Sequence, residues 1–169
     1  MLSLAVSVAL CIGAAGAIED PCAQAGPASL WRAVQAQYST YRLNSLSDLS
    51  EHERKLYESE NAGSCPGVAK ADFFGDKVTS YALILRSGKE AIVITARHAA
   101  RGWQLVEVDR IPDGSVSAVF AEPKGTFEDV ATGERRSSKH AVVHVVKYES
   151  SSIVYILEDS AFHPVFLKD

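Results

Sequence analysis

The stretch C-P-G-V-A-K-A-D-F-F-G-D-K-V-T-S-Y-A-L-I-L, residues 65–85, contains the change of residue pattern that decides the fold. An aspartate loop at residues 72–76 opens directly into an apolar strand that starts near Ser80. Before this stretch, apolar residues recur at helical spacing. From Val78 onward they form short runs, separated by turn residues about every eight to twelve positions, which is typical of β-strands.

Two helices are predicted before residue 65. After Pro27, apolar side chains recur at spacings that one helix face collects, so a first helix is expected over residues 27–41. Ser50, with Glu53 three residues later, has the form of a capping box. It predicts a second helix that ends near Glu60.

Eight strands are predicted in the remainder, at residues 80–86, 91–98, 103–109, 116–121, 126–131, 141–148, 153–158 and 162–167. The links between them are short, and short links join antiparallel neighbours. Segments 81–85 and 141–146 are apolar on both alternating faces, which favours central strands covered by helices or by a second layer. The sequence therefore predicts an α+β domain in which two N-terminal helices pack on a mostly antiparallel, meandering β-sheet.

Residues 1–17 carry no charge and end in Ala15-Gly16-Ala17, a pattern that signal peptidases accept. We expect a signal peptide over 1–17, a single domain over 18–169, and a periplasmic or secreted location. The alternative is an uncleaved anchor, but an apolar run of about fifteen residues is shorter than the roughly 20 that span a bilayer. No stable membrane span is expected in the mature chain.

Cleavage after Ala17 removes Cys11 and leaves Cys22 and Cys65 as the cysteines of the mature chain. In an oxidising compartment such a pair is typical of a disulfide bond. Two separate free thiols are the alternative.

The charge pattern bears on partners. The chain has 17 basic and 21 acidic residues and no long basic run, so nucleic acid is not an expected partner. No phosphate loop, dinucleotide fingerprint or zinc cysteine pattern predicts a cofactor. Arg97, Arg101 and Arg110 flank successive turns and predict an anion-binding patch if they gather at one end of the sheet, whereas solvated turn charges are the alternative.

The histidines offer a second class of function. His140 and His144 would lie on one strand face about 13 Å apart, too far to chelate one ion. A small secreted hydrolase that uses His98 or His144 is an alternative interpretation. No catalytic residue is assigned, because the sequence places no carboxylate or nucleophile beside either of them.

The segment D-F-F-G-D at residues 72–76, followed by Y-A-L-I-L at 81–85, resembles the aspartate loop of FG-GAP (VCBS-type) repeats, whose pattern is D-x-[DN]-G-D-G-x-x-D before an apolar strand. The chain is also similar to small secreted bacterial proteins of unassigned function that carry a single C-P-G…D-F-x-G-D…Y-A-L unit. In the repeat proteins the loop oxygens bind Ca²⁺, so the resemblance implies Asp72 and Asp76 as metal ligands.

Two other ligand positions of that repeat differ in this chain, where Phe74 and Ser80 replace oxygen-rich residues. Ca²⁺ takes six to eight oxygen ligands, so the loop predicts a weak calcium site at most. The alternative is that Asp72 and Asp76 shape a turn into the strand. We expect Phe74 to be buried beside Phe73 against the first strand.

The leading interpretation is a non-catalytic periplasmic or secreted binding module, of which an inhibitor or an immunity-type protein is an example. Its expected partner is an envelope or secreted protein, engaged through an exposed sheet face and its turns. The hydrolase and the weak calcium-binding module remain the alternatives.

Overall fold

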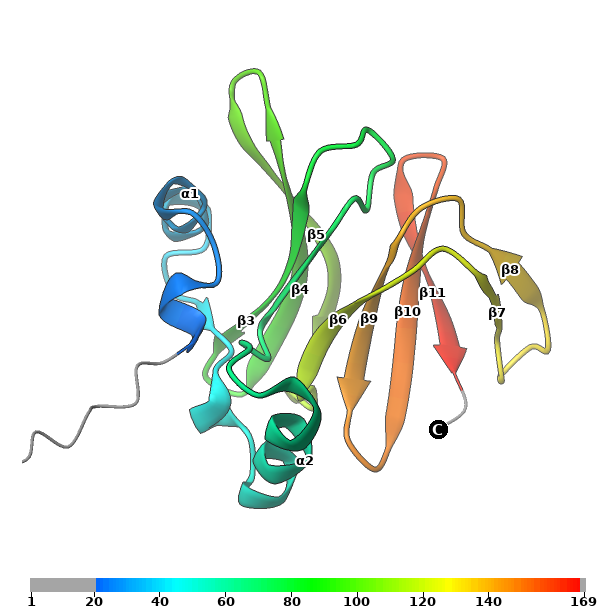
Figure 1. The fold of residues 1–169 in the computed structure, drawn as a ribbon, viewed down its shortest axis with the longest axis horizontal. Coiled ribbons are helices and arrows are strands. Elements are labelled where there is room, and N and C mark those ends of the chain that lie inside the picture. The colour runs from blue at the N-terminus through cyan, green and yellow to red at the C-terminus, as the bar shows by residue number, and fades with distance from the viewer. Residues whose placement is uncertain (1–20, 168–169) are drawn as a thin grey trace, which may run out of the picture.

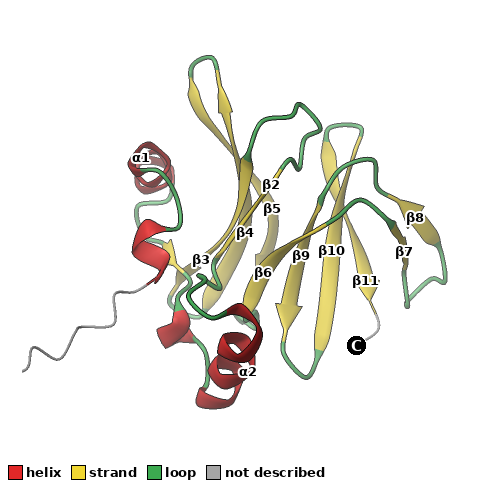
Figure 2. Cartoon of the chain, viewed as in Figure 1, coloured by secondary structure: helices red, strands yellow, loops and turns green. Residues whose placement is uncertain are grey.

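A computed structural model describes residues 21–167 as two α-helices, two 3-10 helices and eleven β-strands (Figures 1 and 2). The N-terminal elements are η1 (Pro21–Gln24), α1 (Ala28–Gln37), β1 (Arg42–Leu43), η2 (Leu46–Asp48) and α2 (Glu51–Asn61). The remaining strands are β2 (Val68–Ala71), β3 (Ser80–Ser87), β4 (Glu90–Ala99), β5 (Gly102–Ile111), β6 (Ala118–Glu122), β7 (Thr126–Glu128), β8 (Arg135–Ser137), β9 (Val142–Lys147), β10 (Ser151–Glu158) and β11 (Ala161–Leu167). The predicted mixture of helices and antiparallel strands is confirmed, and the predicted signal peptide lies outside the described residues.

The strands form two larger sheets and one small ribbon. The first sheet has the order β1-β3-β4-β5, with β2 also paired to β3, and the second has the order β11-β10-β9-β6. Strands β7 and β8 form the ribbon, and every pairing is antiparallel. One meandering sheet was the expectation, whereas the structure has two, because β6 pairs with β9 instead of continuing beside β5.

The two sheets pack face to face. Side chains from the inner face of the first sheet, such as Ile84 and Val93, share one buried cluster with Val119, Val143 and Tyr155 of the second. Successive residues of a strand point to opposite faces, so the alternate residues of β3 and β4 are turned away from this cluster. This layering explains why the segment 81–85 is apolar on both faces.

Helix α1 lies on the outer side of the first sheet, away from the second sheet (Figure 1). Its Leu30 and Val34 share a buried cluster with Leu85 and Ile94. The helix ends at Gln37, four residues before the predicted end. Tyr38 has φ −124° and ψ 52°, which is not helical, so Tyr41 belongs to the chain that enters β1.

Helix α2 has the predicted capping box. The Ser50 hydroxyl accepts a hydrogen bond from the Glu53 backbone N–H, and the Glu53 side chain accepts one from the Ser50 N–H. Tyr57 of this helix is buried with Ala118 of β6. None of the helices in the described residues is long and apolar enough to cross a membrane.

A buried polar cluster joins the N-terminal segment to the link between the two sheets. Asn44 is fully buried, and its Nδ2 donates to the Ser117 carbonyl at 2.9 Å. Its Oδ1 accepts from Nε of Arg86, whose two terminal nitrogens donate to the carbonyls of Gly114 and Val116. Arg86 therefore holds residues 114–116, the segment that carries the chain from the first sheet to the second.

Phe74 was expected to be buried, but the structure shows it only partly buried. Phe73 is fully buried in the cluster between the sheets, whereas Phe74 is only partly buried at its margin. The Phe74 ring packs edge-on against Phe162, with 5.8 Å between ring centroids, and the Arg97 guanidinium lies 4.8 Å from its centroid. The loop thus places one phenylalanine in the core and leaves the next at its edge.

Candidate functional site

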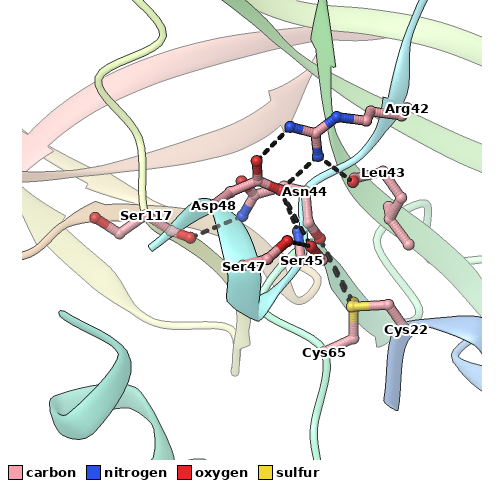
Figure 3. The surroundings of a disulfide bond; sticks show 9 residues. All are labelled: Cys22, Arg42, Leu43, Asn44, Ser45, Ser47, Asp48, Cys65 and Ser117. Atoms are coloured by element: carbon pink, nitrogen blue, oxygen red, sulfur yellow. Dashed lines mark hydrogen bonds and ion pairs between the residues drawn. A yellow bond between two sulfur atoms is a disulfide. The ribbon is translucent and has the colours of Figure 1, made fainter. Parts of the chain in front are cut away.

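The predicted disulfide between Cys22 and Cys65 is present and connects η1 to the chain before β2. It lies directly beside Asn44, as Figure 3 shows. The bond fixes the N-terminal end of the described chain against the first sheet. It therefore also fixes one wall of the hollow between η1, α1 and β1.

We call this hollow the α1–β1 groove. It has a volume of about 620 Å³. The residues that line it are Cys22, Ala23, Trp31, Val34, Gln35, Tyr41, Arg42, Leu43, Ser45, Ser47 and Leu85. This volume falls within the range of about 300–1,000 Å³ that is usual for ligand pockets.

The floor and walls of the α1–β1 groove are apolar and held in place. Leu85 is fully buried and Val34 nearly so, because both belong to the cluster under α1. Trp31 donates its indole N–H to the Gly26 carbonyl at 3.1 Å. Tyr41 donates its hydroxyl hydrogen to Glu90 and accepts a hydrogen bond from Arg110. Both aromatic rings that line the groove, Trp31 and Tyr41, are therefore fixed by hydrogen bonds.

The rim is polar. Arg42 pairs with Asp48 through both terminal nitrogens, one of them at 2.6 Å from a carboxylate oxygen. Burial works to raise the pKa of Asp48, but the hydrogen bonds from Arg42 and Ser45 outweigh it and hold that pKa below its ordinary value. The hydroxyls of Ser45 and Ser47 lie 2.9 Å apart beside this pair (Figure 3). The groove thus combines apolar walls with a rim that can form hydrogen bonds, a composition suited to binding.

The aspartate loop uses its carboxylates to organise its own backbone. Asp72 accepts hydrogen bonds from the N–H groups of Gly75, Asp76 and Lys77, and Asp76 accepts one from Val78. Although burial acts to raise the pKa of Asp72, these backbone hydrogen bonds hold it below its ordinary value. In the part of the chain that the structure describes, no three carboxylate, histidine or cysteine side chains are placed to hold a metal ion.

The three arginines of the predicted anion patch do not gather. Arg97 lies opposite Gln104 near one end of the β4–β5 pair, and its Nε donates to that side chain. Arg110 lies six residues beyond Gln104 along β5, which places it about 20 Å from Arg97 at roughly 3.3 Å per residue. It is also paired with Glu90 and Glu107. Arg97 and Arg101 flank the turn at one end of the β4–β5 pair, whereas Arg110 lies near the other end, so the three arginines do not form one patch.

The two histidines of the hydrolase interpretation lie on different sheets. His98 is on β4, and its ring packs edge-on against Trp103 with 5.3 Å between centroids. His144 is on β9, and its Nδ1 lies 3.2 Å from a carboxylate oxygen of Glu122 on β6. Its Nε2 is buried and has no hydrogen-bond partner among the described residues. The sequence did not reveal Glu122, because β6 and β9 pair across more than twenty residues.

The residues of the α1–β1 groove were also missed as a site. Trp31 and Tyr41 were assigned to one helix face, and Leu43 and Ser47 had no assignment. The early end of α1 places Tyr41 just before β1, a short strand that the sequence pattern did not predict, and the groove opens between these two elements. Comparison of the chain with models of protein families, with curated proteins and with solved structures found no match. The evidence for function is therefore the geometry of the site itself.

Proposed function

We propose that this protein is a non-catalytic binding module, and that its α1–β1 groove captures a segment of a secreted or envelope protein that presents one large apolar side chain. The observation that carries the proposal is the groove itself, with Trp31, Tyr41 and Leu43 around a floor of Leu85. Tryptophan, tyrosine and arginine are the residues that contribute most often to the energetic centres of protein interfaces. The disulfide supports a location in an oxidising compartment.

The groove is already formed without a partner. Its floor is part of a buried cluster, its N-terminal wall is held by the disulfide, and the Trp31 and Tyr41 rings have hydrogen bonds that orient them. A formed site loses little conformational entropy on binding, and this favours affinity. Inhibitors and immunity-type proteins, which capture other proteins, are members of the class we propose.

The proposal is tested by selecting random displayed peptides on the wild-type protein and measuring their affinity for variants with a filled groove. Ser47→Trp and Gln35→Trp place an indole at the groove from its two sides, since both residues are exposed and line it. Ser137→Trp on β8, an exposed serine outside the groove, is the matched control. The indole should displace the apolar anchor.

We expect the selected peptides to share an apolar residue and to bind Ser47→Trp at least about tenfold more weakly, equivalent to roughly 1.4 kcal/mol. They should bind Ser137→Trp as they bind the wild type. Equal affinity for all four proteins would refute the proposal. Failure to select any peptide would also count against it.

A further inference from the structure

A second hollow lies on the face of the second sheet that is turned away from the first sheet, beside the C-terminal end of α2. We call it the α2–β9 groove. It has a volume of about 320 Å³, near the lower end for ligand pockets. Its lining residues are Glu60, Asn61, Phe120, Glu122, His144, Val146 and Tyr148. A hollow of this size suits one side chain better than a larger ligand.

A histidine fixes one carboxylate in this groove. The Nδ1 of His144 lies 3.2 Å from Glu122, and only 17% of the His144 side chain is exposed. The Glu122 side chain is 44% exposed, and His144 is its only hydrogen-bond or ion-pair partner in the described part of the chain. A carboxylate has two acceptor oxygens, and the contact with His144 involves one of them, Oε1. Glu122 therefore keeps hydrogen-bonding capacity for a ligand.

The end of α2 adds negative potential to the same groove. The last turn of α2 contains Glu58 and Glu60 and no basic residue. A helix C-terminus carries a partial negative charge, so acidic residues there are unfavourable for the helix itself. Burial, and then the negative charges of Glu60 and Glu53, raise the pKa of Tyr148 above its ordinary value. The nearby Lys147 lines a different hollow, together with Asp48 and Glu53.

The other walls of the groove are aromatic. Phe120 lies beside His144, with 6.2 Å between ring centroids, and Tyr148 follows the end of β9. An aromatic face attracts a cation, and a guanidinium group stacks on such a face while it donates hydrogen bonds to carboxylates. Val146 provides apolar surface for the aliphatic part of the same side chain.

We propose that the α2–β9 groove binds the guanidinium group of an arginine side chain from a partner protein, with Glu122 and Glu60 as its anionic partners and the Phe120 and Tyr148 rings as its walls. Arginine fits better than lysine because its planar group can stack and form two hydrogen bonds at once. This site is separate from the α1–β1 groove and recognises a different chemical group.

The experiment is a titration of the ¹⁵N-labelled protein with the blocked tripeptide acetyl-Gly-Arg-Gly-amide, followed by NMR at low salt. The matched ligand is the same peptide with citrulline, which keeps the shape of arginine without the charge. We expect saturable shifts at Asn61, Phe120 and Tyr148. The citrulline peptide should bind about tenfold more weakly or worse, the loss expected when a charge-assisted contact becomes neutral.

Glu122→Gln and Glu60→Gln should each weaken arginine binding by about fivefold or more, which corresponds to roughly 1 kcal/mol. Glu128→Gln on β7, an exposed glutamate elsewhere, is the control that should leave binding unchanged. Glu60 is exposed, so Glu60→Gln tests the charge even if Glu122→Gln disturbs the fold. Ser47→Trp should also leave arginine binding unchanged, which separates this result from the fate of the α1–β1 groove. Equal binding of the two peptides, or full affinity in both glutamine variants, would overturn the proposal.

Discussion

Replacing Arg86 by methionine tests whether the buried polar cluster holds the two sheets together. In the wild type, Arg86 donates to Asn44 Oδ1 and to the carbonyls of Gly114 and Val116, and all three of these residues are buried. Methionine keeps much of the side-chain volume but donates no hydrogen bond. The Gly114 carbonyl would keep its hydrogen bond from the Val116 N–H at 2.8 Å, whereas Asn44 Oδ1 and the Val116 carbonyl would lose the donor that Arg86 provides.

A buried group left without a partner costs about 1–3 kcal/mol. Burial lowers the pKa of Arg86, which shows that the charge itself is held at a cost. Removing the charge returns part of that cost, so we take the lower end for each acceptor. For the two acceptors left without a partner, the expected loss is about 2 kcal/mol, a large share of the roughly 5–15 kcal/mol that stabilises a typical domain.

The assay is urea unfolding followed by circular dichroism, which gives the midpoint and the slope. Arg54→Met on α2, an exposed arginine, is the control and should change the free energy of unfolding by about 0.5 kcal/mol or less. In a double-mutant cycle, Arg86→Met and Asn44→Ala should show a coupling energy of about 1 kcal/mol or more. A loss below about 1 kcal/mol for Arg86→Met, at an unchanged slope, would refute this reasoning.

Three further predictions follow from the core. Phe73→Ala should lower the free energy of unfolding by about 3–5 kcal/mol, and Phe74→Ala should lower it by clearly less, because only Phe73 is fully buried. A calorimetric ranking of the two variants in the reverse order would contradict this. Thr95→Val should stabilise the protein by about 1 kcal/mol, since the Thr95 hydroxyl is buried without a partner among the described residues, and a lower melting temperature would disprove it. Burial and the hydrogen bond to Asp109 raise the pKa of Tyr155 above its ordinary value. The contribution of Tyr155 to the free energy of unfolding should therefore be fully present below the unfolded-state tyrosine pKa of about 10 and should be lost as the pH rises above it. Urea midpoints measured as a function of pH should fall less steeply above that pH in Tyr155→Phe than in the wild type.

Local patterns in the sequence predicted those parts of the fold that local chemistry decides. The Ser50–Glu53 capping box begins α2 where it was expected. Most strands of the C-terminal two thirds fall close to their predicted ranges. The disulfide followed from the number of cysteines left after the expected cleavage. In each case the signal lies within a few residues or in a simple count.

Contacts between distant segments were not predictable in the same way. The separation into two sheets follows from the pairing of β6 with β9, and Arg86 holds the link between the sheets from almost thirty residues away. The pairing of Glu122 with His144 depends on the register of β6 against β9, which no turn fixes. The α1–β1 groove exists because α1 ends at Gln37, where Tyr38 and Tyr41 pack against the buried cluster under α1 and do not continue the helix. Residue spacing alone does not contain these long-range choices.

The most direct test of the proposed binding function is a methyl NMR map of a selected peptide bound to the wild-type protein. Val34, Leu43 and Leu85 line the α1–β1 groove, so their methyl resonances should shift on titration, and those of Val142 and Val165 under the β7–β8 ribbon should not. The same peptide should cause no shifts at these positions in Ser47→Trp. Shifts confined to another surface, or unchanged shifts in Ser47→Trp, would show that the groove is not the binding site.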